Sequence, residues 1–258
     1  MQKVILIKLI LMISPMVLSL EKIVINYQTD KTPLQGVFYK PEVSKTNGAI
    51  LLVHEWYGLN TYAKFRAEQL AKMGYPTFAI DLYGAGKRAN HPKEAKQFML
   101  EATKDTAELS ERFLAAINVL TSEQNIDKEK LVAIGYCFGG GVVLNMARQG
   151  IDLKAVASFH GGLSSPLKAN KDNFKAIVLV ANGGADPMVP KEDVINFVAE
   201  MQQANADYEL INFPKAKHSF TVKAADEMGK KYDLPLAYNE EADQVSFKAL
   251  TNLLERTL

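Results

Sequence analysis

Residues 130–141 have the sequence Lys-Leu-Val-Ala-Ile-Gly-Tyr-Cys-Phe-Gly-Gly-Gly, an apolar, strand-like run that ends in Gly-x-Cys-x-Gly. A helix-like segment, residues 142–148, follows directly. This order is typical of a nucleophile elbow, the sharp strand-to-helix turn that exposes a catalytic side chain, with Cys137 in the place of the usual serine. Gly135 and Gly139 fit that interpretation, because a bulky side chain two positions from the nucleophile would collide with the neighbouring backbone of the strained turn.

The chemistry of Cys137 depends on its surroundings. In an elbow, the first amides of the following helix point at the reacting centre, where they favour a thiolate and later an oxyanion. Taken alone, the motif equally fits a buried, unreactive cysteine beside glycines that allow close helix packing. Cys137 is the only cysteine in the sequence, so no disulfide can form within the chain and the thiol is free for chemistry.

The composition is that of a globular protein. The chain has 258 residues, of which 48% are hydrophobic and 23% charged, enough for one large α/β domain, which we place at residues 20–258. The formal net charge of +1 gives no support for binding to nucleic acid or to an anionic membrane. A small, near-neutral ligand therefore remains the favoured class of partner.

The first 19 residues have the features of a signal peptide: a short positive segment, then an apolar one, with cleavage expected after Ser19. This predicts a periplasmic or secreted protein. Lys8 and Pro15 interrupt the apolar run, so we expect no stable membrane anchor. The alternative is a first strand at residues 4–10 in a cytoplasmic protein; an intact N-terminus on the natively expressed protein would contradict export.

The pattern of apolar residues predicts the fold class. Two β-rich runs, 22–27 and 34–39, are separated by a proline-containing loop, as in an antiparallel hairpin. From residue 49 onward, continuous apolar runs typical of buried strands alternate with helical stretches. The predicted strands are 49–53, 77–80, 131–134, 155–159, 176–180 and 208–213, and the predicted helices are 62–73, 92–120, 141–148, 191–203 and 240–254. We therefore predict a mostly parallel sheet with helices on both faces, entered through an antiparallel hairpin.

In such a sheet, functional residues gather at the carboxyl ends of the strands. The polar residues at those ends are His54, Glu55, Asp81, Cys137, His160, Asp186 and His218. Asp186 alone would fit a turn or a helix cap, and His218 alone a surface residue. However, nucleophile, acid and histidine follow one another here in the order of the α/β-hydrolase triad, each after a predicted strand.

From about residue 22 to residue 256, the chain resembles the dienelactone hydrolase (carboxymethylenebutenolidase) family of α/β-hydrolases. The motifs that carry the resemblance are His-Glu-Trp-Tyr-Gly-Leu at 54–59, Asp-Leu-Tyr-Gly at 81–84, Gly-Tyr-Cys-Phe-Gly-Gly at 135–140, Gly-Ala-Asp-Pro at 184–187, His-Ser-Phe at 218–220 and Ala-Tyr-Asn-Glu-Glu-Ala-Asp at 237–243. They span nearly the whole of the chain after residue 20. The resemblance implies the α/β-hydrolase fold.

The resemblance also implies a triad of Cys137, Asp186 and His218. His218 would take the thiol proton and later protonate the leaving group, while Asp186 would hold the imidazole in the required tautomer. In the family, the glutamate at the position of Glu55 lies close to the resting thiol and helps to activate it. Glu55 is therefore expected to be a fourth active-site residue, the alternative being a solvated loop carboxylate.

The family pattern places the oxyanion hole at the backbone amides of Trp56 and Phe138. His54 and His160 are expected to have structural or pocket-lining roles, because His218 already fills the role of base. The four histidines and the one cysteine show no metal-ligand spacing, and Gly-Gly-Gly at 139–141 lacks the Lys-Ser/Thr ending of a phosphate loop. We therefore expect neither a metal nor a cofactor.

The sequence departs from the family at two substrate-binding positions. Dienelactone hydrolases hold the substrate carboxylate with two arginines, and those positions are Ala85 and Val222 here. The departures argue against dienelactone itself and leave a different ester, lactone or thioester equally open. The candidate substrate-binding residues near these positions are Tyr83, Lys87, Arg88 and Lys223. For the three cations, the alternative is a solvated surface charge.

Two functions follow from the sequence. The first is a cysteine-dependent hydrolase that cleaves a small ester, lactone or thioester through an acyl-enzyme on Cys137. The second is an exported binding protein that keeps the α/β-hydrolase fold with little or no turnover. The complete set of Cys137, Asp186 and His218 favours the hydrolase, because a silent site does not require all three.

Overall fold

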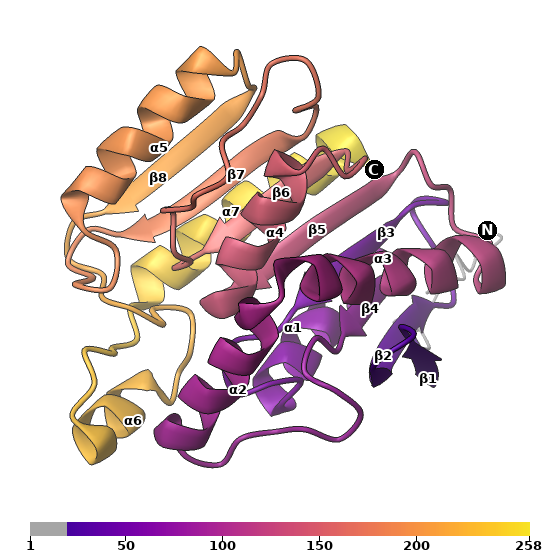
Figure 1. Ribbon diagram of the computed structural model, residues 1–258, viewed down its shortest axis with the longest axis horizontal. Helices are drawn as coiled ribbons and strands as arrows, with labels where there is room; N and C mark the ends of the chain where they lie inside the picture. Colours follow the sequence, from indigo (N-terminus) through magenta and orange to yellow (C-terminus); the bar gives the residue numbers. More distant parts are fainter. Residues whose placement is uncertain (1–19) are drawn as a thin grey trace, which may run out of the picture.

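The computed structural model describes residues 20–258, which form a single eight-stranded sheet covered by helices (Figure 1). The predicted signal peptide at 1–19 and the alternative strand at 4–10 lie outside the described residues, so export stays a prediction. The strands lie in the order β1-β2-β4-β3-β5-β6-β7-β8. They are β1 (Leu20–Gln28), β2 (Pro33–Pro41), β3 (Ala49–Val53), β4 (Thr77–Ile80), β5 (Leu131–Tyr136), β6 (Ala155–Phe159), β7 (Ile177–Gly183) and β8 (Tyr208–Phe213).

The strand directions confirm the predicted class. β1 and β2 form an antiparallel hairpin, β2 also pairs antiparallel with β4, and all of the remaining neighbours are parallel. The three central strands β3, β5 and β6 are buried at every residue. This explains their continuous apolar sequences, because a strand between two helical layers has no solvent-facing side.

Helices cover both faces of the sheet. The side chains of α1 and α7 join one apolar cluster, and those of α3, α4 and α5 join the other. In Figure 1, α4 lies in front of the sheet and α7 behind it. The helices are α1 (Thr61–Lys72), α2 (Pro92–Lys104), α3 (Thr106–Glu123), α4 (Phe138–Arg148), α5 (Lys191–Gln203), α6 (Ala225–Tyr232) and α7 (Glu240–Thr257).

One helical prediction was wrong, and one helix was missed. The single helix expected at 92–120 is two helices, because Asp105 leaves the helical conformation with φ −114° and ψ 94°. Its side chain accepts a hydrogen bond from the amide of Glu108 at 3.0 Å, which caps α3. Helix α6 was not predicted at all; it has eight residues, of which only Ala225 and Gly229 are buried. Its acidic first turn and basic last turn were the available signal.

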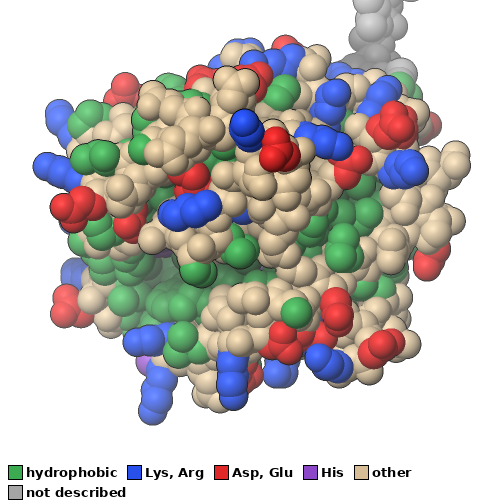
Figure 2. Space-filling model, turned by 45° about the horizontal axis from the view of Figure 1, so that its top comes forward, with side chains coloured by type: hydrophobic (Ala, Val, Ile, Leu, Met, Phe, Trp, Pro, Cys, Tyr) green, Lys and Arg blue, Asp and Glu red, His purple; other side chains and the backbone are tan. Residues whose placement is uncertain are grey.

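The topology brings the ends of four parallel strands to one side of the molecule. β3, β5, β7 and β8 end at Val53, Tyr136, Gly183 and Phe213, so the loops after them lie at the same edge of the sheet. Apolar side chains gather in a recess on the side toward which β7 and β8 point (Figures 1 and 2). Among residues 20–258, no helix is long and apolar enough to cross a membrane.

Candidate active site

Cys137 occupies a strained turn between β5 and α4. Its backbone has φ 53° and ψ −116°, a conformation that costs a residue with a side chain on the order of 1–3 kcal/mol. The flanking glycines make the turn possible: a Cβ on Gly135 would lie 2.1 Å from the carbonyl oxygen of Gly139, and one on Gly139 would lie 2.4 Å from that of Val53. The sequence Gly-x-Cys-x-Gly is therefore required by sterics.

The backbone of Cys137 is held at both ends. Its amide donates to the carbonyl of Phe159 at 3.0 Å, and its carbonyl accepts from the amide of Gly140 at 3.0 Å. The side chain is only partly buried. Cys137 thus presents its thiol at the N-terminus of α4.

His218 and Asp186 form a buried pair in the loops after β8 and β7. Nδ1 of His218 lies 2.7 Å from Oδ2 of Asp186, and the other carboxylate oxygen of Asp186 accepts from the amide of Met188 at 2.8 Å. Nε2 of His218 is buried without a hydrogen bond of regular geometry. An ionised Asp186 therefore fixes the proton on Nδ1 and leaves Nε2 as the nitrogen that can exchange a proton.

The charge state of His218 depends on Cys137. Burial opposes the imidazolium, but the charge of Cys137 and the hydrogen bond with Asp186 outweigh burial and raise the pKa of His218 to about 10. The two side chains are therefore close enough for Cys137 to stabilise the imidazolium of His218. Cys137, His218 and Asp186, predicted from three distant motifs, lie together in the structure.

Glu55 lies in the same buried group, directly after β3. It is only 6% exposed, so the alternative of a solvated loop carboxylate is wrong. Burial raises the pKa of Glu55 to about 7, even though the charges of His218 and Arg66 and a hydrogen bond with Ser219 act in the opposite direction. Glu55 therefore changes charge near neutral pH, beside the imidazole of His218.

The backbone around the expected oxyanion hole is fixed by side chains. Tyr83 donates its hydroxyl hydrogen to the carbonyl of Trp56 at 3.1 Å, and Nδ1 of His54 lies 2.7 Å from the carbonyl of Glu55. Within residues 20–258, neither the amide of Trp56 nor that of Phe138 donates a hydrogen bond to another protein group. Both amides are therefore unoccupied donors.

His54 and His160 have structural contacts, as the sequence indicated. Nε2 of His54 accepts from the amide of Leu82 at 3.2 Å while Nδ1 donates to a carbonyl, which uses both ring nitrogens of the neutral form. Nε2 of His160 lies 2.8 Å from the hydroxyl of Thr221, and its ring packs 5.3 Å from that of His218. Burial lowers the pKa of both His54 and His160.

A buried network behind His218 was not predicted. Arg66 of α1 donates to the hydroxyl of Tyr62 at 3.1 Å and to the carbonyl of Thr221 at 2.8 Å, and it forms an ion pair with Asp243 of α7. The hydroxyls of Tyr62 and Thr221 are 2.6 Å apart. The sequence signal was the position of Arg66 on the apolar face of α1, between Ala63 and the other buried residues.

The positions of the two family arginines carry no charge in the site. Ala85 is exposed, and Val222 packs in an apolar cluster with Ala225 and Leu236. Of the candidate substrate-binding residues, Tyr83 is buried, with its ring 5.4 Å from that of Phe138, beside the nucleophile. Tyr83 is thus in contact with the site from the side of β4.

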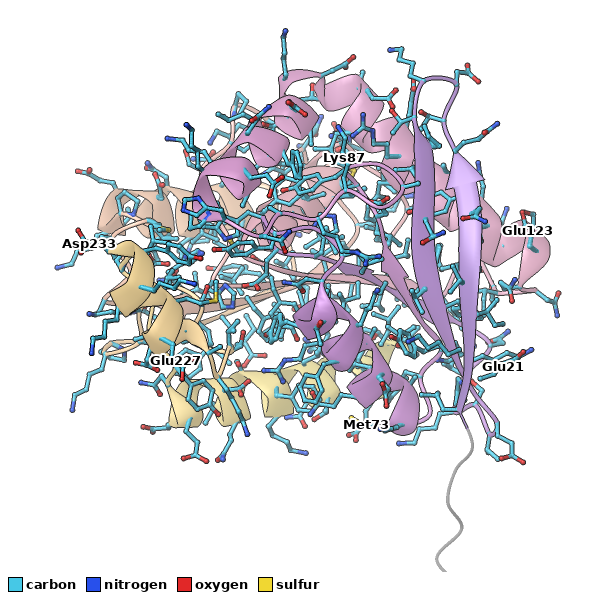
Figure 3. The ribbon with its side chains drawn as sticks, turned by 90° about the horizontal axis from the view of Figure 1, so that it is seen from below. Glu21, Met73, Lys87, Glu123, Glu227 and Asp233 are labelled. Carbon is cyan, nitrogen blue, oxygen red and sulfur yellow. The ribbon has the colours of Figure 1, made fainter. Side chains whose placement is uncertain are left out.

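The three candidate cations do not form a common anion clamp. Lys87 is paired with Glu101 at 3.6 Å and lies beside α2 and α3, away from Glu227 of α6 and from Asp233, which caps the C-terminus of that helix (Figure 3). Arg88 is exposed. Lys223 lines a cavity of about 700 Å³ between α1 and α7. Among residues 20–258, no cluster of three or more His, Cys, Asp or Glu could hold a metal ion.

Comparisons with known proteins agree with this geometry. The family model of the dienelactone hydrolase family matches residues 34–258. An uncharacterised protein of Caenorhabditis elegans is 37% identical over 152 residues, which are 57% of this chain and 92% of that protein. A "Putative carboxymethylenebutenolidase" of Saccharolobus solfataricus is 24% identical over 90% of this chain and 97% of that one.

Among solved structures, a dienelactone hydrolase-like promiscuous phosphotriesterase from metagenomic libraries superimposes with a TM-score of 0.84. It is 30% identical and covers 92% of this chain and 98% of its own. The predicted α/β-hydrolase fold is therefore confirmed. A match that spans nearly the whole domain, from β2 to the C-terminus, leads to one conclusion: the chain belongs to the dienelactone hydrolase family, whose members are hydrolases.

Proposed function

We propose that the protein is a cysteine-dependent hydrolase that cleaves small esters, lactones or thioesters through an acyl-enzyme on Cys137. The observation that carries this proposal is the position of Cys137 on the strained turn, next to a His218 imidazole whose other nitrogen is bound by Asp186 at 2.7 Å. The names of two relatives support the substrate class: a carboxymethylenebutenolidase and a dienelactone hydrolase-like enzyme.

Acylation follows from the arrangement of the side chains. The thiol proton resides on Nε2 of His218, and the Sγ lone pair of Cys137 attacks the substrate carbonyl carbon while the carbonyl π electrons move to oxygen. The amides of Trp56 and Phe138 donate hydrogen bonds to that oxygen, each contributing on the order of 3 kcal/mol. Collapse of the tetrahedral intermediate expels the alcohol or thiol group, which takes the proton from His218.

Deacylation uses the same groups in reverse. Nε2 of His218, now neutral, removes a proton from a water molecule, and the hydroxide oxygen attacks the acyl carbon bound to Cys137. The carbon–sulfur bond then breaks, the acid leaves, and the thiolate–imidazolium pair is restored. Asp186 keeps Nδ1 protonated through both halves of the cycle, so the imidazole does not change tautomer.

The direct test is a panel of aryl esters, lactones and thioesters followed by mass spectrometry of the acid-quenched reaction. We expect turnover of at least one class and a peptide containing Cys137 that carries the acyl group. Turnover without this adduct, at a rate that Cys137→Ala retains, would reject the mechanism. No turnover of any compound in the panel would favour the alternative of a binding protein.

A second expectation concerns Glu55 and the pH dependence of stability. Because the pKa of Glu55 is about 7 when folded and close to 4.5 when unfolded, the folded state binds more protons between these values. The free energy of unfolding should therefore fall as pH rises from 4.5 to 7, by about 3 kcal/mol from this group. Glu55→Gln, which cannot ionise, should lose this decrease.

The measurement is urea unfolding of the wild type and Glu55→Gln from pH 4 to pH 8. Other titrating groups cancel in the difference between the two proteins, so the variant should gain stability relative to the wild type as pH rises. Glu209→Gln, on the edge strand β8, is the matched control, because its side chain is exposed. A difference that stays flat with pH would contradict the raised pKa.

A further inference from the structure

A cavity of about 400 Å³ lies between α3, α4 and the loop residues 165–167. This volume falls within the range of about 300–1,000 Å³ that is usual for small-molecule sites. Its ten lining residues include no charged side chain. The apolar surface comes from Leu109, Phe138, Val142, Pro166 and Leu167.

One wall of the cavity is formed by α4, the helix that directly follows Cys137. The α4 residues that line it are Phe138, Gly141, Val142 and Asn145, which share one face of the helix at spacings of three and four residues. Because one helical turn rises 5.4 Å, Gly141 lies only about one turn beyond the nucleophile. The Phe138 ring also packs against His54 and Tyr83 at 5.9 and 5.4 Å, so it contacts the active site and the cavity together.

The outer wall of the cavity is anchored by a buried ion pair. Arg148 of α4 donates to Glu200 of α5 at 2.7 Å and to the carbonyl of Leu163 at 2.9 Å. Glu200 also accepts from the amide of Ala169 at 2.8 Å. Both ends of the loop that carries Leu167 are therefore held in place, although Leu167 itself remains 38% exposed.

Two polar side chains at the cavity already accept hydrogen bonds. Oδ1 of Asn145 accepts from Arg148 at 3.1 Å, and the hydroxyl of Ser165 accepts from the amide of Leu167 at 3.1 Å. Gly141 adds space: a Cβ there would meet no atom closer than 3.4 Å. The cavity therefore offers apolar contacts and no cation for a carboxylate, which matches the uncharged residues at the family arginine positions.

We propose that this cavity binds the apolar acyl chain of the substrate while its carbonyl carbon reacts with Cys137. The preferred substrates are then uncharged esters or thioesters with a straight-chain acyl group longer than acetyl. This assignment rests on the proposed hydrolase function and adds the substrate class to it. Each methylene that enters the cavity should raise kcat/KM by up to about fourfold, the equivalent of about 0.8 kcal/mol per buried CH₂.

The test uses p-nitrophenyl acetate, butyrate, hexanoate and octanoate, so that only the acyl chain changes. For the wild type, we expect kcat/KM to be at least about tenfold higher for hexanoate than for acetate. Gly141→Leu places a side chain in the cavity and should lower the hexanoate-to-acetate ratio at least fivefold, with Gly141→Ala intermediate. The ratio does not depend on how much of a variant is folded.

A second pair of variants changes polarity instead of volume. Leu167→Asp puts a charge on the cavity wall and should lower the hexanoate-to-acetate ratio at least fivefold. Ile195→Asp is the control, because Ile195 of α5 is similar in size to leucine and 64% exposed; this variant should leave the ratio unchanged. The acyl-chain assignment would be overturned by a wild-type ratio of one or less, or by a ratio that neither Gly141→Leu nor Leu167→Asp lowers. In either case, turnover of the acetate would still support the hydrolase function. No turnover of any ester would overturn both.

Discussion

Cys137→Ala is expected to lower kcat/KM by about 10⁴-fold or more for every substrate that the protein cleaves. The variant has no nucleophile, and His218 also loses the charge that does most to raise its pKa to about 10. The backbone of the elbow is held by two hydrogen bonds that do not involve the side chain: the amide of Cys137 donates to the carbonyl of Phe159, and the amide of Gly140 donates to the carbonyl of Cys137. We therefore expect the fold to survive the change. The measurement is steady-state kinetics on the best substrate of the panel.

The variant Cys137→Ser keeps a hydroxyl group at the position of the nucleophile but removes the negative charge that a thiolate would carry. The serine hydroxyl stays protonated at neutral pH, so the imidazolium of His218 should lose its main stabilising partner and its pKa should fall below that of the wild type. NMR titration of the His218 ring measures this shift. Residual activity above about 1% in Cys137→Ala, with an unchanged thermal midpoint, would contradict the role of Cys137 as nucleophile.

Much of the fold could be predicted because the local signals agree with the tertiary structure. β3, β5 and β6 are continuous apolar runs, since each is buried between two layers of helices. The break between α2 and α3 could not be predicted, because Asp105 interrupts the helix through a side-chain cap, without glycine or proline. Helix α6 depends on close packing: a Cβ on Gly229 would lie 2.7 Å from the carbonyl oxygen of Leu236.

The residues of the candidate site also fall into a predictable group and an unpredictable one. Residues that follow strands, such as Cys137, Asp186 and His218, could be predicted, because parallel topology brings strand ends together. The contact of Arg66 with Asp243 could not, since it joins helices α1 and α7, 177 positions apart in the sequence. The acyl-chain cavity is likewise invisible in the sequence, because three separate segments form its walls.

The lack of free cations near the proposed site, among residues 20–258, bears on the choice of substrate. Val222, at one family arginine position, packs in an apolar cluster, and Lys87 is already paired with Glu101. Neither residue therefore offers a free cation to a substrate carboxylate. Apolar burial beside Phe138 is the remaining source of substrate binding, which is why we expect chain length to matter more than charge.

Asp186→Asn is expected to lower kcat by about 10³- to 10⁴-fold while the fold is preserved. Oδ1 of Asp186 accepts from the amide of Met188 at 2.8 Å, so the carbonyl oxygen of an asparagine must keep that position. Its NH₂ group would then face Nδ1 of His218, which could only accept a hydrogen bond. The proton would move to Nε2, and the imidazole could no longer take a proton from the thiol of Cys137.

Kinetics and ¹⁵N NMR of the His218 ring together test this reversal. In Asp186→Asn, the neutral ring should carry its proton on Nε2, and the pKa of His218 should be lower than in the wild type, because the hydrogen bond to a carboxylate is lost. Asp193→Asn, an isosteric change in the first turn of α5, should leave both readouts unchanged. Activity within tenfold of the wild type, or a neutral ring that keeps its proton on Nδ1, would show that Asp186 does not set the tautomer of His218.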